Sequence, residues 1–202
     1  MSDFFSPAAE RNKEPILRLL QPHLEKLDRL LEIGSGTGQH AVYFAGQYPG
    51  ILWQTSDLPA NLAQLAMALR QSELANLPSP WMIDVNDPPV QHDFPAIYTA
   101  NTLHIMSEGS VEQFFRYTNK ALARSAQLFI YGPFNRNGEF TSESNQQFDA
   151  SLRSRGVGSG IRDREWIIEL AAEIGLQLDE LAAMPANNIM MTFSRGLAEG
   201  SV

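Results

Sequence analysis

The chain of 202 residues contains no cysteine. This absence excludes disulfide bonds, thiolate metal ligands and a cysteine nucleophile, and it fits a reducing compartment. The sequence also lacks an uninterrupted apolar run of about 18 residues, the length that a membrane-spanning helix needs. Its N-terminus has neither the basic stretch nor the apolar core of a secretory signal peptide. We therefore expect a cytoplasmic protein with no membrane partner.

Basic residues are scarce: the sequence has 15 Lys and Arg and 23 Asp and Glu, which gives a formal net charge of −8. Proteins that bind nucleic acids neutralise phosphates with Lys and Arg, so this balance disfavours a nucleic-acid partner. No cluster of His and carboxylate residues has the spacing of metal ligands, and we expect no metal. A small molecule is the expected partner, and the sequence leaves open whether the chain is a monomer or a homodimer.

What the sequence does contain is typical of a globular protein, with 44% hydrophobic and 19% charged residues. Its length predicts a single domain with a substantial core. Strands and helices alternate along the chain, which favours an α/β fold whose parallel sheet is covered by helices on both faces. We predict one domain over 1–202, in which 1–28 forms an N-terminal lid or helix and 29–202 form the sheet core.

Hydrophobic periodicity and turn residues place the individual elements. The predicted strands are 29–33, 51–56, 81–83, 96–100, 126–131, 176–183 and 189–195. The predicted helices are 14–28 with Pro15 at its first position, 38–48, 60–72, one opened by Ser110, 145–153, and 164–174 capped by Asp163. The last two strands are separated by a polar turn and should form an antiparallel hairpin, so the last of the seven strands runs against the others.

The most specific motif is the segment Leu30–Gly38, where an apolar strand ends in Glu32 and glycines follow at 34, 36 and 38. Glycine permits positive φ angles and lets a ligand approach the backbone closely. The dinucleotide-binding fingerprint is G-x-G-x-x-G, but Gln39 occupies the position of its third glycine. A nucleotide-like cofactor other than a dinucleotide is therefore favoured, and a plain turn is the alternative.

The pattern E-x-G-x-G-x-G resembles motif I of class I S-adenosylmethionine (SAM) methyltransferases. This resemblance implies a Rossmann-like fold, in which the loop of Gly34, Gly36 and Gly38 contacts the methionine half of SAM and Glu32 helps to hold it. Longer blocks resemble one methyltransferase-like family of bacteria and animals that is catalogued as a domain of unknown function. These blocks are Ser6–Leu17, Leu30–Gly38, Gly132-Pro133-Phe134 and Ile161-Arg162-Asp163. The resemblance implies SAM binding but no particular substrate.

Polar residues that follow the predicted strands should meet at one edge of the sheet, where ligands of open α/β sheets bind. Asp57 offers two acceptor oxygens for the ribose hydroxyls, although it could instead cap a helix. The resemblance places Asp84 at the adenine amino group and the Val85 N–H at the ring, with a simple turn as the alternative for Asp84. Asn101 could hold the amino group of SAM.

Further candidates come from three other segments. Arg11 and Asn12 precede the first predicted helix and should touch the cofactor carboxylate or the substrate, unless this arm is only solvated. His104 could act as a general base because histidine titrates near neutral pH, and a structural histidine is the alternative. Tyr131 is the second candidate catalytic residue. The predicted substrate-binding residues are Phe134, Asn135, Arg136 and Arg162. The remaining histidines, His23, His40 and His92, lack a partner pattern and are interpreted as surface or core fillers.

These residues favour transfer of the SAM methyl group to a small-molecule acceptor through O, N or S. The sequence Asn101-Thr102-Leu103-His104 lacks the N/D-P-P-Y/F motif, which disfavours methylation of base or glutamine amino groups; a protein acceptor stays open. One alternative is a non-catalytic module that binds SAM or its product S-adenosylhomocysteine (SAH) as a sensor or scaffold. A second, an NAD-dependent oxidoreductase, is disfavoured by Gln39 and by the lack of a Tyr-x-x-x-Lys pair.

Overall fold

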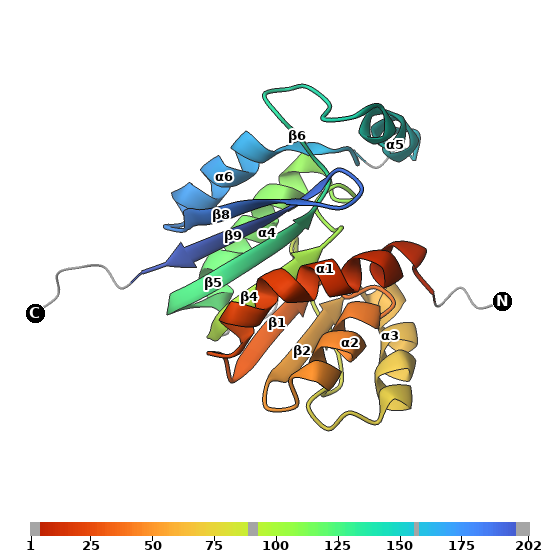
Figure 1. Cartoon of the computed structure of the whole chain (residues 1–202), viewed down its shortest axis with the longest axis vertical. Helices are drawn as coiled ribbons and strands as arrows, with labels where there is room; N and C mark the ends of the chain where they lie inside the picture. The colour runs from red at the N-terminus through yellow and green to blue at the C-terminus, as the bar shows by residue number, and fades with distance from the viewer. Residues whose placement is uncertain (1–4, 89–92, 156–157, 197–202) are drawn as a thin grey trace, which may run out of the picture.

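Figure 1 shows the computed structural model of the protein, in which the described residues are 5–88, 93–155 and 158–196. The interpretation of His92 therefore lies outside the described residues. Seven strands form one sheet in the order β3-β2-β1-β4-β5-β9-β8. These strands are β1 (Arg29–Ile33), β2 (Leu52–Asp57), β3 (Trp81–Met82), β4 (Phe94–Ala100), β5 (Leu122–Gly132), β8 (Gln177–Met184) and β9 (Asn188–Arg195).

The first five strands are mutually parallel, and β9 is antiparallel to both β5 and β8. This confirms the predicted α/β fold, the seven strands and the reversal of the last one. A separate parallel pair joins β6 (Phe134–Asn135) to β7 (Arg162–Asp163). The strand order reverses at β1, because β2 lies on one side of it and β4 on the other. Such a switch point is where open α/β sheets bind ligands.

Helices cover both faces of the sheet (Figure 1). One face carries α1 (Pro7–Leu24), α2 (Gln39–Gln47) and α3 (Pro59–Ser72), and the other carries α4 (Glu108–Ala121) and α6 (Arg164–Glu173). The helix α5 (Glu143–Arg153) lies beyond the end of the sheet at which the parallel strands finish.

Each face has its own hydrophobic core, and these two cores fix the orientation of the strands between them. The side under α1 and α2 contains Phe44 and Trp53, and the side under α4 contains Phe114 and Phe193, all fully buried. Burying one such side chain contributes roughly 1.5–3 kcal/mol. The sheet is therefore a rigid support for the loops at its carboxyl edge.

The predicted helix over 14–28 is wrong at its start, because α1 begins seven residues earlier. Ser6 is the N-cap, its hydroxyl accepts a hydrogen bond from the Ala9 N–H at 3.2 Å, and Pro7 takes the first helical position. Pro15 and Pro22 lie inside the helix, where each removes a backbone donor. A buried stripe of Ile16, Leu20 and Leu24 holds the helix on the sheet nevertheless. The residues Arg11 and Asn12 therefore lie on a helix, not on an arm before it.

Other boundaries also differ from the prediction. Ser107, not Ser110, caps α4, because the Ser107 hydroxyl accepts from the Ser110 N–H at 3.1 Å. The strand β5 starts at Leu122, which pairs with Phe94 at the start of β4. Asp163 occupies the N-cap position of α6 without a capping hydrogen bond, and its carboxylate accepts from the Gly138 N–H at 3.2 Å. Among the described residues, no helix is long and apolar enough to cross a membrane.

Candidate functional site

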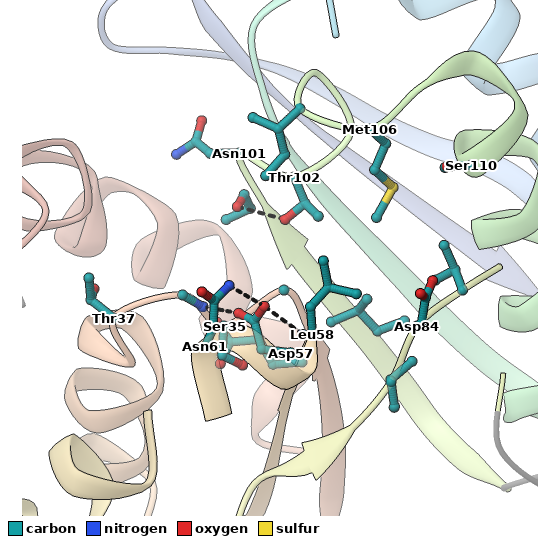
Figure 2. A pocket seen from close by; sticks show the side chains of 18 of the residues that line it. Ser35, Thr37, Asp57, Leu58, Asn61, Asp84, Asn101, Thr102, Met106 and Ser110 are labelled. Carbon is teal, nitrogen blue, oxygen red and sulfur yellow. Dashed lines mark hydrogen bonds between the residues drawn. The ribbon is translucent and has the colours of Figure 1, made fainter. Parts of the chain in front are cut away.

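A cavity of about 520 Å³ opens at the carboxyl ends of β1, β2 and β4. This volume falls within the range of small-molecule sites, roughly 300–1,000 Å³. Figure 2 shows side chains from several strand ends converging on it. Of the predicted cofactor residues, those that line the cavity are Glu32, Gly34, Gly36, Asp57, Asp84, Val85 and Asn101. The prediction did not include the other lining residues, which are Ser6, Ala9, Ile33, Ser35, Thr37, His40, Leu58, Asn61, Ile83, Asn86, Ala100, Thr102, Ile105, Met106, Ser107 and Ser110.

The three glycines after β1 all have left-handed backbone, with φ angles of 74°, 54° and 75° at Gly34, Gly36 and Gly38. A Cβ at Gly34 would lie 2.8 Å from Cγ2 and Oγ1 of Thr102, so the loop passes directly against the loop after β4. A Cβ at Gly38, which does not line the cavity, would lie 2.9 Å from Leu65 in α3. These two glycines allow close packing within the protein.

Gly36 is different, because a Cβ there would meet no atom of the protein within 4 Å. Since Gly36 lines the cavity, the added group would be next to space that a ligand can use. Gly138 offers a matched comparison, with a φ of 78° and open space, in a turn that does not line the cavity.

We expect Gly36→Ala and Gly138→Ala each to cost about 1–2 kcal/mol of folding stability, because alanine is strained in left-handed backbone. If the cavity binds SAH, as the resemblance of the glycine loop to motif I implies, only Gly36→Ala should weaken that binding, by about ten-fold or about 1.4 kcal/mol. Chemical unfolding and calorimetric titration of both variants measure the two effects separately. Equal affinities in the two variants would mean that the glycine loop does not contact the ligand.

The carboxylate of Asp57 organises the floor of the cavity. One oxygen accepts from the Gly36 N–H at 2.6 Å, and the other accepts from the Leu58 N–H at 2.8 Å and from Asn61 Nδ2 at 2.7 Å. Figure 2 shows these bonds joining the glycine loop to the start of α3. These three hydrogen bonds hold the carboxylate of Asp57 in one orientation at the lining of the cavity.

Glu32 lies at the end of β1 with only 2% of its surface exposed. Its carboxylate accepts from Trp53 Nε1 at 2.9 Å. Burial raises the pKa of Glu32 to about 7, against the lowering effect of hydrogen bonds from Trp53 and Ser35; the nearby charge of Asp57 raises it further. A carboxyl group that titrates near neutral pH in a cavity is typical of a binding or catalytic site.

The Asp and Glu residues that line the cavity have no Lys or Arg among the other described lining residues to balance them. Glu32, Asp57 and Asp84 all line it, and Asp84 lies on the side opposite Thr37 in Figure 2. No Lys or Arg of the described chain is among the lining residues. His40 does not supply a positive charge, because burial lowers its pKa to about 4. The cavity therefore attracts a cation and repels an anion.

His40 is not the filler that the sequence suggested. Its Nε2 lies 2.6 Å from the side-chain oxygen of Asn12, and its Nδ1 lies 3.2 Å from the hydroxyl of Tyr98. Nearby, the Ser6 N–H donates to the side-chain oxygen of Gln39 at 2.5 Å. Contacts from α1 to the start of α2 thus bring Ser6 and Ala9 to the cavity. These pairs are 28 to 58 residues apart, and no spacing rule connects them.

Asn101, directly after β4, has a φ of 57°, which is uncommon for a residue other than glycine. Its N–H donates to the Tyr131 carbonyl at 2.8 Å. A Cβ at Gly132 would lie 3.8 Å from Nδ1 of His104, 3.9 Å from Oδ1 of Asn101 and 3.7 Å from the ring of Phe134. The structure therefore gathers these three predicted residues around Gly132, and Asn101 is the member that also lines the cavity.

His104 is buried, with the ring of Phe148 at 5.2 Å in an edge-to-face arrangement. Burial lowers the pKa of His104 to about 4, and the positive charges of Arg155 and Arg162 lower it further. The imidazole is thus neutral at pH 7 and able to accept a proton. Its role as a base stays a prediction, since His104 is not among the residues that line the cavity.

Tyr131, near the end of β5, lies beside two residues of α1. Burial raises the pKa of the Tyr131 hydroxyl, while a hydrogen bond with Asn12 and the charge of Arg11 oppose that rise. The hydroxyl is therefore protonated at neutral pH. The predicted residues Arg11, Asn12 and Tyr131 are brought together, outside the lining of the cavity.

Arg162 is 5% exposed and binds protein groups rather than the cavity. Its guanidinium donates to the carbonyls of Met106 at 2.5 Å and Gly158 at 2.7 Å, and it forms an ion pair with Glu108 at 3.4 Å. Because Met106 lines the cavity, Arg162 positions one wall of it.

The other predicted substrate residues also lie outside the cavity lining. Phe134 and Asn135 are buried, and the Asn135 amide donates to the Ile161 carbonyl at 3.4 Å. Arg136 is exposed in a turn, where its backbone pairs with that of Glu139. In the part of the chain that the structure describes, no group of three or more His, Asp and Glu could hold a metal ion.

A family model described as "Protein of unknown function (DUF938)" matches residues 3–195. The chain belongs to the DUF938 family. This finding agrees with the narrower of the two resemblances in the sequence, whose blocks include the strand and glycine loop that form the floor of the cavity.

The fold of this DUF938 chain is shared with solved methyltransferase structures. A candidate O-methyltransferase from Nostoc punctiforme PCC 73102 matches with a TM-score of 0.80 and 14% identity, over 92% of this chain and 56% of the other. An O-methyltransferase family protein from Burkholderia thailandensis matches with a TM-score of 0.77 and 13% identity, over 95% of this chain and 60% of the other. Human N-acetylserotonin methyltransferase, solved in complex with SAM, matches with a TM-score of 0.78 and 12% identity, over 94% of this chain and 53% of the other. The chain thus spans little more than half of these proteins and has the Rossmann-like methyltransferase fold.

Proposed function

We propose that this DUF938 protein is a SAM-dependent methyltransferase that acts on a small-molecule acceptor. The observation that carries the proposal is the charge of the cavity. Asp57, Asp84 and Glu32 line it, and Glu32, with a pKa of about 7, is partly ionised at neutral pH. No Lys or Arg of the described chain is among the lining residues. SAM has a sulfonium and an ammonium group against one carboxylate, so it is a cation. A dinucleotide, whose pyrophosphate is anionic, would be repelled by the same residues.

The residues present fit SAM. The open space at Gly36 admits a ligand close to the backbone, and Asp57 is already oriented to accept from ribose hydroxyls. Asp84 and Val85 would hold the adenine. At the other end of the cavity, Glu32 would hold the cationic amino-acid group. Human N-acetylserotonin methyltransferase, which has the same fold, was solved in complex with SAM, and this supports SAM as the ligand.

When bound, SAM would supply an activated methyl group to the acceptor's heteroatom and would leave as SAH, which keeps the electron pair of the broken S–CH₃ bond. A protonated acceptor would also have to give up its proton. The chain's own residues would align the acceptor and exclude water. His104 is the proposed acceptor of that proton, because its imidazole is neutral and lies beside Asn101 in the cluster around Gly132. The hydroxyl of Tyr131 stays protonated at neutral pH, so it would contribute hydrogen bonds and not act as the base.

The test is SAH formation by the purified chain, supplied with SAM and the small-molecule fraction of a bacterial extract. We expect SAH to accumulate with wild type and not with Asp57→Ala. Thermal unfolding in the presence of SAM, SAH or NAD provides the comparison with a dehydrogenase, and SAM and SAH should raise the midpoint. Stabilisation by NAD alone would overturn the proposal, and SAH binding without turnover would favour a sensor.

A further inference from the structure

Three consecutive carbonyl groups in one wall of the cavity are bound by a single segment from a distant part of the chain. The wall is the loop 104–106 after β4, and the last two of its residues line the cavity. The segment is 158–162. Its donors are the Gly160 N–H to the first carbonyl at 2.9 Å, the Ser159 hydroxyl to the second at 3.1 Å and Arg162 Nη2 to the third at 2.5 Å. The segment therefore fixes the backbone of this wall.

Arg162 is the donor that joins the two loops. The nitrogen that binds the Met106 carbonyl also donates to the Gly158 carbonyl at 2.7 Å, and Nη1 lies 3.4 Å from the exposed Glu108. Nε of this buried guanidinium has no hydrogen-bond partner among the described residues. Burying a charge with incomplete partners is costly, and apolar side chains often replace such a group without loss of stability. Stability alone therefore does not account for an arginine here, whereas a fixed cavity wall does.

The segment 158–162 is itself anchored on α5. The buried carboxylate of Asp149 accepts from the Ile161 N–H at 2.7 Å through one oxygen and from Arg153 Nε at 2.6 Å through the other. A Cβ at Gly160 would lie 3.1 Å from Oδ1 of Asp149 and from Nη2 of Arg153, so the backbone packs closely on this helix. The wall of the cavity is thus supported by α5 as well as by β4.

This wall belongs to the end of the cavity assigned to adenine. Figure 2 shows Met106 on the same side of the cavity as Asp84 and away from Thr37. A methionine side chain is flexible, so its contact with an aromatic base depends on where its backbone is held. With the Met106 carbonyl bound by Arg162, the side chain starts from one fixed position opposite the carboxylate of Asp84.

We propose that Arg162 is a positioning residue for the cofactor: it fixes the backbone of Met106, and Met106 holds the adenine against Asp84. This inference rests on the proposed function and adds how the adenine end is recognised. Arg162 itself touches neither the cofactor nor the acceptor. Its loss should loosen the fit of the base, and with it the preference for a base that can donate to Asp84.

The test compares adenosine with inosine, each measured in competition with SAH. Inosine has a carbonyl oxygen in place of the adenosine amino group, so the ratio of the two affinities reports the contact with Asp84. We expect wild type to prefer adenosine by about ten-fold, and Arg162→Met to lose most of this preference and to bind SAH about ten-fold more weakly. Arg162→Lys keeps the charge without the planar fork and should be intermediate. A smaller folded fraction lowers both apparent affinities equally, so the ratio does not respond to stability.

The matched control is Arg195→Met. Arg195 also donates to a loop carbonyl, that of Ile174 at 2.7 Å, but it lies on β9 beside Ala126, near the start of β5 and away from the cavity. This variant should keep the wild-type SAH affinity and the wild-type ratio.

SAH affinity is measured first in every variant. If SAH does not bind to wild type, the proposed function fails. If wild type binds SAH but does not prefer adenosine, or if Arg162→Met keeps the wild-type ratio, the inference on Arg162 alone is wrong. Should Arg162→Met not fold, Arg162→Lys and Ser159→Ala answer the same question, because each weakens the hold of the segment 158–162 on the wall.

Discussion

An Asp57→Ala variant is expected to bind SAH about 100-fold more weakly than wild type, a loss of about 2.7 kcal/mol. The substitution removes the acceptors proposed for the ribose hydroxyls. It also releases the Gly36 N–H from its 2.6 Å bond, so the glycine loop loses the contact that orients it. Leaving the N–H groups of Gly36 and Leu58 without this acceptor should cost the fold about 1–3 kcal/mol as well.

Calorimetric titration with SAH, at a temperature where circular dichroism shows the variant to be folded, measures the affinity loss. Asp57→Asn keeps the shape and one acceptor oxygen, and it should fall between wild type and Asp57→Ala. Asp28→Ala removes an exposed aspartate just before β1 and serves as the matched control with wild-type affinity. Wild-type affinity in folded Asp57→Ala would contradict the assignment of this carboxylate.

A Glu32→Gln variant is expected to be more stable than wild type at pH 8 yet weaker in SAM binding. The folded pKa of Glu32, about 7, lies above its ordinary value of 4.5. The protonated side chain therefore stabilises the fold in full below pH 4.5, and this stability is lost as the pH rises through 7. At about 1.4 kcal/mol per pKa unit, the loss is about 3 kcal/mol, which a neutral glutamine avoids.

Urea unfolding between pH 5 and 8 measures this effect. Wild-type stability should decline across the range, and the decline should be smaller in Glu32→Gln, while Glu112→Gln, an exposed site on α4, should follow wild type. SAM affinity of Glu32→Gln at pH 8 should fall about ten-fold, because the negative charge that attracts the cation is gone. A variant that is less stable than wild type at pH 8 and binds SAM equally well would contradict both roles of Glu32.

The fold and the core of the candidate site could be predicted because local sequence determines them. Glu32 and the three glycines define a strand, a tight turn and a helix within nine residues. Asp57, Asp84 and Asn101 each follow a strand, and parallel strands bring their carboxyl ends to one edge. Knowing the order of elements was therefore enough to bring these side chains into one cavity.

The start of α1 could not be predicted in the same way, because two segments carry similar signals. Pro15 after polar residues has the features of a helix start, and so does Pro7 after Ser6. What decides between them is the packing of the buried stripe on the sheet and the contact of Asn12 with His40, both of which are tertiary. Local propensity gives way to such packing, even with two prolines inside the helix.

Contacts between residues far apart in the sequence could not be predicted either. Arg162 was predicted to bind the substrate, but it is buried and donates to carbonyl groups of two loops. His40 has partners from α1 and β4 that no spacing rule connects to it. Both residues hold the walls of the cavity, and only the packed structure shows which atoms they meet.

A crystal structure of the protein grown with SAH is the most direct test of the account. We expect SAH in the cavity, with its ribose at Asp57, its adenine beside Asp84 and Val85, and its amino-acid end toward Glu32. Clear density for SAH at another place on the protein, or an unliganded cavity in crystals of protein saturated with SAH, would contradict the account.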